Sequence, residues 1–351
     1  AAAAADNDLS SQIGNIKVSY RYLLKYFAEN MPDPGRDKLR EDIRASLYTL
    51  ADQRSIAVNC QTPGELYYSL FDSYKKTISL PALMADYRTH LATLGDGSDI
   101  AKLQECEKLE QQMFKKIWLT FPFSAADYDA LAGFMADEAI DVPAKAIALA
   151  ALFLALGKFY DSAKLALLVE SYISLDNSTL QIRALIYVVL SIFLNRNRVA
   201  RDSEIMAKFP LMKDVPHFAA DIENIIMRLV AARNTENLTH KVANEIMPGI
   251  MKSAPDLMKK FRDGSLSDVA DIEDNPEWAD ALDKSVFTEK MEEMTKLQME
   301  GNDIYMGTFS RLKSFPFFSD IANWFMPYTS RHSVVVKAFG GDNARMGVLV
   351  D

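Results

Sequence analysis

Histidine and cysteine, two of the side chains that most often catalyse reactions or bind metals, are few in this sequence and widely spaced. Histidine occurs four times in the 351 residues, at His90, His217, His240 and His332. A helical zinc hydrolase needs two histidines one turn apart around a glutamate, and no such spacing occurs. The two cysteines, Cys60 and Cys106, lack the spacing of a zinc site or a disulfide framework, so we interpret both as buried thiols. The sequence predicts no metal site.

Nucleotide and hydrolase motifs are missing as well. There is no phosphate-binding G-x-x-x-x-G-K-[ST] or G-x-G-x-x-G loop and no G-x-S-x-G elbow. The adjacent carboxylates Glu292 and Glu293 would point about 100° apart on a helix and could not readily share a proton. We therefore expect no cofactor and favour a non-catalytic protein. An enzyme stays the alternative, and it would need a pocket holding a carboxylate with a displaced pKa.

One compact basic cluster could bind an anionic group. Arg196, Arg198 and Arg201 are expected in a tight connection after a buried helix, together with Asn195 and Asn197. Basic residues at this place can cap the negative end of a helix, pair with carboxylates of a partner protein, or contact nucleic acid. Because no aromatic residues alternate with the arginines, capping is the favoured interpretation, and the other two stay open.

A second candidate is an unusually aromatic segment near the end of the sequence. It contains six large rings, namely Phe315, Phe317, Phe318, Trp324, Phe325 and Tyr328. So much apolar surface must be covered by something. Packing in the core of this chain is the favoured interpretation, and docking of a protein partner is the alternative.

The elements that would position these residues are helices. Glycine (14) and proline (13) are scarce, and good helix formers dominate nearly every stretch. Apolar residues at i, i+3, i+4 and i+7 predict a series of helices, at about 9–31, 36–59, from 63, from 81, 100–118, 142–156, 159–175, 179–194, 199–209, 218–229, 236–262 and from 287. The helix at 100–118 should be half exposed because charged residues separate its apolar positions. The fold class is therefore all-α.

Short connections between successive helices predict antiparallel neighbours. Two of the helices, around 144–156 and 182–194, carry almost no charge and should be enclosed by others. The β-branched run at 186–189 could instead form a strand, but no partner strand lies nearby. Helices at 142–209 form two pairs with a period of about 36 residues, which is typical of helical-repeat arrays.

The turn between the first two of these helices carries a family resemblance. Leu156-Gly157-Lys158-Phe159-Tyr160-Asp161-Ser162-Ala163 resembles the turn of a tetratricopeptide repeat, although one extra residue separates the glycine from the alanine. HEAT-like helix pairs are similar too. The resemblance covers about residues 143–209 and implies an irregular, right-handed, solenoid-like array of antiparallel helix pairs, of the kind that holds protein segments.

Three phenylalanine-proline pairs recur where one helix should end and the next begin. They are Phe121-Pro122, Phe209-Pro210 and Phe315-Pro316. Proline is tolerated in the first turn of a helix, and an aromatic residue before it can staple that turn. We interpret them as packed corners, with a binding motif as the alternative.

Charge and composition suggest how the chain is divided. Residues 263–300 contain twelve acidic and three basic residues, which leaves 36 of each elsewhere and accounts for the whole net charge of −9. We divide the chain into a linker or unassigned stretch (1–5), an N-terminal helical region (6–139), a central helical-repeat region (140–262), an acidic connecting segment (263–285), a C-terminal helical region (286–340) and a tail (341–351).

The sequence thus favours a helical-repeat scaffold that binds a protein segment or assembles into a larger complex. Binding of nucleic acid through Arg196–Arg201 is an alternative, although an acidic chain disfavours it. No stretch has the length of a membrane span, since the longest apolar run, 184–194, is too short. We expect a cytoplasmic protein, and export stays an alternative because Ala1–Ala5 do not look like a native start. The partner and the oligomeric state are left open.

Overall fold

The computed structural model describes residues 2–29, 34–61, 64–75, 77–94, 99–232, 316–327 and 332–339, with isolated positions at 240, 241, 244, 292, 293, 295, 296 and 329. These residues form helices and no strand, so the protein is all-α over the described part of the chain. By its internal contacts the chain divides into two compact units. The first comprises Ala1–Asp214 and Phe325–Asp351, and the second comprises Val215–Trp324.

The first unit contains most of the helices. They are α1 (Ala2–Ala28), α2 (Arg36–Asn59), α3 (Leu66–Lys75), α4 (Leu80–Ala92), α5 (Ile100–Leu119), α6 (Ala125–Ala136), α7 (Val142–Leu156), α8 (Ser162–Ser174), α9 (Ser178–Val199), α10 (Ser203–Met212) and α19 (Ser333–Phe339). Most of the predicted helices agree with these bounds to within a few residues, but α9 extends past its predicted end at 194, and no helix was predicted over α6 or α19. α1 begins earlier than predicted because its first residues are alanine, the strongest helix former.

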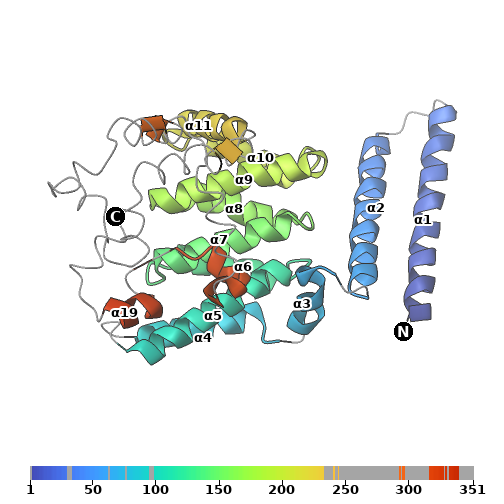
Figure 1. Cartoon of the computed structure of the whole chain (residues 1–351). Coiled ribbons are helices and arrows are strands. Elements are labelled where there is room, and N and C mark those ends of the chain that lie inside the picture. The colour runs from blue at the N-terminus through green and yellow to red at the C-terminus, as the bar shows by residue number, and fades with distance from the viewer. Residues whose placement is uncertain are drawn as a thin grey trace. The chain divides into compact units, whose positions relative to one another are not determined.

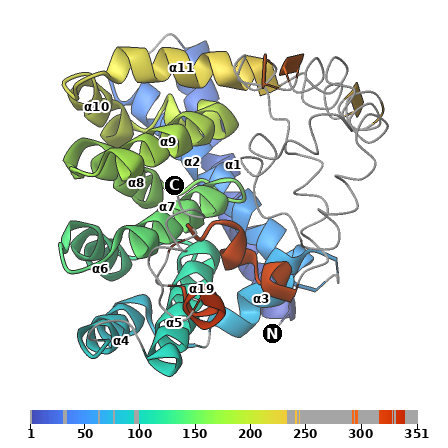
Figure 2. The same ribbon diagram turned by 60° about the vertical axis from the view of Figure 1, so that its left-hand side comes forward.

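The helices from α4 to α10 form two rows (Figures 1 and 2). In one row α4 packs on α6, α6 on α8, and α8 on α10, while in the other α5 packs on α7 and α7 on α9. Contacts between α4 and α5, α7 and α8, and α8 and α9 join the rows, and α3 packs on α5. From α4 to α10, each helix therefore contacts a helix two places along the chain, and α4, α5, α7, α8 and α9 also contact a sequence neighbour.

The core runs along the second row, where α7 is the most enclosed helix. Eleven of its fifteen residues are buried, including Lys145, which confirms the prediction for 144–156. α9 differs from the expectation, because its C-terminal half leaves Phe193 69% exposed in the described structure. Leu185 and Val188 of α9 are buried against its neighbours, and the run at 186–189 is helical rather than a strand.

α9 also passes a test of length and composition for a membrane-crossing helix. Its most apolar stretch has a mean hydropathy of 1.5, and 28% of that stretch is buried. A core helix of a water-soluble protein satisfies the same criteria, and α9 packs on both α7 and α8. The expectation that the chain has no membrane span stays a prediction.

A C-terminal segment of the first unit packs against α5. The ring of Phe325 stacks on Phe114 with centroids 5.8 Å apart, and Glu107 of α5 accepts hydrogen bonds from the backbone N–H and hydroxyl of Ser333 at 2.6 and 2.7 Å. Glu107 thereby occupies the N-terminal end of α19, where a carboxylate is stabilised by the free N–H groups and the helix dipole. The buried His332 lies beside the same carboxylate, at 3.6 Å.

In the second unit the structure describes α11 (Phe218–Ala231) and two short 3-10 helices, η3 (Pro316–Ser319) and η4 (Ile321–Trp324). Pro316 opens η3, as a proline in a first helical turn should. The predicted helices at 236–262 and from 287, the acidic segment 263–285 and the tail 341–351 lie wholly or almost wholly outside the described residues. The proposed domain boundaries therefore stay predictions.

The phenylalanine-proline pairs do not share one setting. Phe121-Pro122 lies in the connection between α5 and α6, as expected, and its peptide bond is cis. Phe209-Pro210 was expected between two helices but lies inside α10. Pro210 is the third residue from the C-terminal end of this ten-residue helix, so its missing N–H removes one hydrogen bond from the last turn.

Candidate functional site

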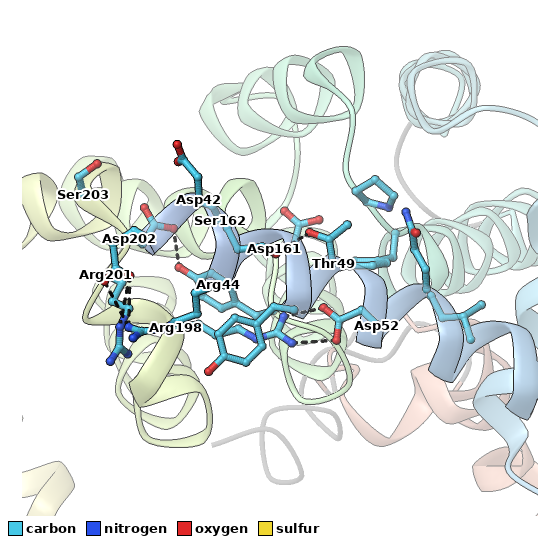
Figure 3. Close-up of a pocket in the computed structure, with 18 of the residues that line it drawn as sticks. Asp42, Arg44, Thr49, Asp52, Asp161, Ser162, Arg198, Arg201, Asp202 and Ser203 are labelled. Atoms are coloured by element: carbon cyan, nitrogen blue, oxygen red, sulfur yellow. Dashed lines mark hydrogen bonds and ion pairs between the residues drawn. The ribbon is translucent and has the colours of Figure 1, made fainter. Parts of the chain in front are cut away.

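A cleft of about 760 Å³ lies in the first unit, between α2 and three connections of the helical rows. The connections follow α5, α7 and α9, and they all reach one edge of the array. Figure 3 shows residues of α2 and of these connections around the same space. The lining residues used below are Glu41, Asp42, Arg44, Ala45, Tyr48, Thr49, Asp52, Phe121, Pro122, Tyr160, Asp161, Arg198, Arg201 and Asp202.

Each connection is fixed by an N-cap on the helix that follows it. Ser124 and Asp127 form a capping box at the start of α6. Asp161 accepts from the backbone N–H groups of Ala163 and Lys164 at the start of α8, and Asp202 accepts from that of Ile205 at the start of α10. Such caps stabilise a helix start by about 1 kcal/mol each and set where the chain turns.

Consecutive connections are also bonded to each other. The other oxygen of Asp161 accepts the backbone N–H of Phe123 at 2.8 Å, and the hydroxyl of Tyr160 donates to Asp202 at 2.6 Å. Burial and the bond to Asp202 raise the pKa of Tyr160 far above its usual value, so the hydroxyl stays a donor at any physiological pH. The cleft floor is thus a ladder of three connections joined by hydrogen bonds between neighbours.

A buried lysine, Lys164, links the start of α8 to the C-terminal end of α5 at the same edge of the array. Lys164 is 1% exposed and donates from Nζ to the carbonyls of Ile117 and Thr120, at 3.0 and 2.5 Å. These carbonyls belong to the C-terminal end of α5, where a cation is favoured by the helix dipole. Burial nevertheless lowers the pKa of Lys164 to about 8.

The arginine cluster predicted from the sequence reaches this cleft in part. Arg198 forms a two-pronged ion pair with Asp52 of α2, at 2.6 and 2.8 Å, and lies over the ring of Tyr48 at 4.3 Å. Arg201 pairs with Glu41 of α2 at 3.4 Å and donates to the carbonyl of Asn197. Arg196 is exposed near the end of α9.

The sequence predicted all three arginines in a tight connection after the helix, but Arg196 and Arg198 lie within α9 and only Arg201 follows it. α9 continues to Val199 through a kink at Asn195, whose backbone is not helical (φ −113°, ψ 21°). The amide of Asn195 donates to the carbonyl of Leu156 at the end of α7 and to that of Ser191. This bond from α9 to its row neighbour α7 holds the last turn of α9, and with it Arg198, toward α2.

These pairings bear on the nucleic-acid alternative. Two of the three arginines are engaged by carboxylates of the same chain, and the cleft lining holds more carboxylates than cations. A phosphate backbone would meet this surface with little net attraction. The geometry therefore gives that alternative no support.

The predicted aromatic segment is divided between the two units. Phe317, Phe318 and Trp324 lie in the second, where the Trp324 indole N–H donates to the carbonyl of Phe318 at 2.9 Å and their rings lie 4.8 Å apart. Phe325 lies in the first unit against α5, as described above. All four described rings are half-buried. Phe315 and Tyr328 lie outside the described residues, and the role of the whole segment in partner binding stays a prediction.

The enzyme alternative requires a carboxyl group with a displaced pKa, and the carboxyl group whose pKa is raised, that of Glu110, does not line the cleft. Glu110 on α5 is buried, accepts a hydrogen bond from Tyr87 at 2.8 Å, and lies near Asp141, so burial and the neighbouring charge raise its pKa to about 8. The helix was expected to be half exposed, and Lys102, Glu105 and Lys108 are exposed, but Glu110 and Lys116 are buried. The larger of two cavities beside Glu110 is only about 50 Å³, too small for a substrate.

Among the described residues, no group of three histidine, cysteine or acidic side chains could hold a metal ion. Comparison with protein-family models, with curated proteins and with solved structures finds no match. The site must therefore be interpreted from its own geometry.

The sequence pointed to the arginines of the cleft but not to their partners. Asp52 and Tyr48 lie one turn apart on α2, within an ordinary amphipathic pattern. Asp52 is 146 residues from Arg198, and nothing in its sequence surroundings marks it. The N-cap aspartates left a local signal, since each directly precedes a serine and a helical run, but their bonds to neighbouring connections depend on the packing of the rows.

Proposed function

We propose that this protein is a non-catalytic helical-repeat scaffold, and that the cleft between α2 and the three connections binds a segment of a partner protein. The observation that carries the proposal is the cleft itself, with about 760 Å³ bounded by a helix and by successive turns of the array. This volume lies within the range typical of binding pockets.

The wider architecture supports an array of the tetratricopeptide or HEAT-like kind. Each helix from α3 to α8 packs on the helix two places further along the chain, as in arrays of antiparallel helix pairs, and we propose that the rows form an irregular right-handed solenoid. The N-caps Ser124, Asp161 and Asp202 follow one another at intervals of about 40 residues, which is within the range for such repeats. Arrays of this kind present extended surfaces to protein partners.

The cleft lining suits a peptide better than a small reactive substrate. Aromatic and aliphatic groups such as Tyr48, Phe121 and Pro122 can bury side chains of a segment, while exposed charges such as Asp42 can orient it. Caps and ion pairs within the chain hold Asp161, Asp202 and Arg198 in fixed positions, so the lining is organised before any partner arrives. A preorganised surface loses less entropy on binding.

The test compares two bulky substitutions on α2. Thr49 is exposed and lines the cleft, whereas Ser46 is exposed on the same helix and does not line it. Thr49→Trp should fill the cleft and remove a specific partner from quantitative affinity capture, while Ser46→Trp should retain it. Identical partner sets for wild type and both variants would contradict the proposal.

A further inference from the structure

A second surface lies between α1 and α2, and of its lining residues only Arg44 also lines the cleft. α1 packs on α2, and none of its described side chains at positions 10–29 is fully buried. Yet α1 carries a stripe of apolar residues, and Tyr20 is 49% exposed within it. A long helix with an apolar stripe that its neighbour covers only in part normally binds something else.

The uncovered stripe forms one wall of a groove. A cavity of about 350 Å³ runs between the two helices, and its apolar lining comes from Ile16, Tyr20 and Leu23 of α1 and from Ile43 and Leu47 of α2. On both helices these positions recur every three, four or seven residues, so the apolar surface follows the helix axes. Its shape is that of a seam into which a third helix can pack.

The charges along this groove have one sign. Its remaining lining residues are Lys17, Arg40 and Arg44, and no carboxylate lines it. Arg40 and Arg44 both approach Glu41, at 3.5 and 3.3 Å, but Glu41 is also paired with Arg201. Asp37 approaches Arg40 at 3.5 Å in an exposed pair, which contributes little. One shared glutamate and one exposed aspartate do not neutralise three cations, so the rim of the groove stays positive.

We infer that the groove between α1 and α2 binds an acidic amphipathic helix of a partner protein, with its apolar face in the seam and its carboxylates on Lys17, Arg40 and Arg44. A second copy of this chain fits less well, because a twofold axis over the groove would bring the same cations of both copies together. A membrane surface fits less well too, because the lining is a concave seam between two helices rather than a flat face. This inference is independent of the cleft proposed above.

The test uses two synthetic helical peptides and the full chain. Each peptide has about 18 residues, with leucine at i, i+3, i+4 and i+7. One carries glutamate on the flanks of the leucine stripe, and the other carries lysine at the same positions. Fluorescence anisotropy should show binding of the glutamate peptide, weakened by added salt, and no binding of the lysine peptide. Equal binding of the two peptides, or none, would overturn the inference.

Two matched tyrosines locate the site. Tyr20 lines the groove and is 49% exposed, whereas Tyr22 is 55% exposed on the same helix and does not line it. Tyr20→Glu should weaken binding of the glutamate peptide about tenfold or more, while Tyr22→Glu should leave it unchanged. Leu47→Glu on the opposite wall should act like Tyr20→Glu. Circular dichroism checks that each variant folds, and equal effects at Tyr20 and Tyr22 would count against the groove.

Charge reversal tests the rim. Replacing Lys17 and Arg40 together by glutamate should abolish binding of the acidic peptide and allow the lysine peptide to bind. Thr49→Trp, which fills the cleft, should leave peptide binding unchanged, so failure of the cleft proposal and failure of this one are distinguishable. A dimer in sedimentation analysis, or pelleting with phosphatidylserine vesicles, would overturn the inference if it disappeared in Tyr20→Glu but not in Tyr22→Glu.

Discussion

Replacing Glu110 by glutamine should change how the stability of the first unit depends on pH. The pKa of Glu110 is raised from 4.5 to about 8 by burial and by Asp141, so the folded state holds a proton that the unfolded state releases. Below about pH 4.5 this group imposes no penalty on folding. As the pH rises toward 8, the free energy of unfolding falls, because the unfolded state gains from ionising the carboxyl group while the folded state does not.

The magnitude follows from the shift. Each pH unit between the two pKa values changes the free energy of unfolding by about 1.4 kcal/mol, so the loss between about pH 5 and 7 is about 3 kcal/mol. Glutamine keeps the shape of Glu110 and can still accept the hydrogen bond from Tyr87, but it does not ionise. Glu110→Gln should therefore lack this loss, and its advantage over wild type should increase with pH across this range.

Urea unfolding followed by circular dichroism at a series of pH values measures the effect. The control is Glu105→Gln, on the same helix at an exposed position, which should follow the wild-type pH dependence. Parallel curves for wild type and Glu110→Gln from pH 5 to 7 would refute the reasoning, because they would mean that Glu110 ionises alike in the folded and unfolded states.

Three further outcomes are expected in the same assay. Arg198→Ala should destabilise the first unit by about 2 kcal/mol, because it leaves the mostly buried Asp52 without its guanidinium, and exchanging the two residues should recover part of the loss. Wild type should gain about 3 kcal/mol as the pH rises from about 8 to 10.5, since the pKa of Lys164 is lowered to about 8 in the folded state, and Lys164→Met should lack this gain. Tyr160→Phe should cost about 1 kcal/mol through loss of the bond to Asp202, and no change would argue against a ladder of bonded connections.

Much of the secondary structure could be predicted from the sequence because apolar periodicity is a local signal. The bounds of α7 agree with the predicted 142–156, since Pro143 begins a helical turn and Gly157 ends the run. The kink at Asn195 could not be predicted this way. It depends on a hydrogen bond to Leu156, a residue 39 positions away on another helix.

The cleft was predicted less completely, because it too depends on contacts between residues far apart in the sequence. The arginines lie close together in the sequence and can be recognised there as a cluster. The carboxylates that pair with them lie on α2, far away in the sequence, and only the folded structure identifies them. Glu110 is a charged residue whose burial the sequence did not predict. Sequence patterns place a charged residue at the surface, and its burial is accommodated because the carboxyl group can stay protonated and share a hydrogen bond with Tyr87.

Site-specific photo-crosslinking from the cleft tests the central proposal most directly. A photoreactive amino acid would replace Ala45, which lines the cleft, or Ser46, its exposed neighbour outside it. In cells that express the protein, we expect position 45 to form an adduct with one segment of one partner protein, and position 46 to form none. Adducts of the same proteins from both positions, or an adduct from position 46 alone, would contradict the proposal that this cleft binds a protein segment.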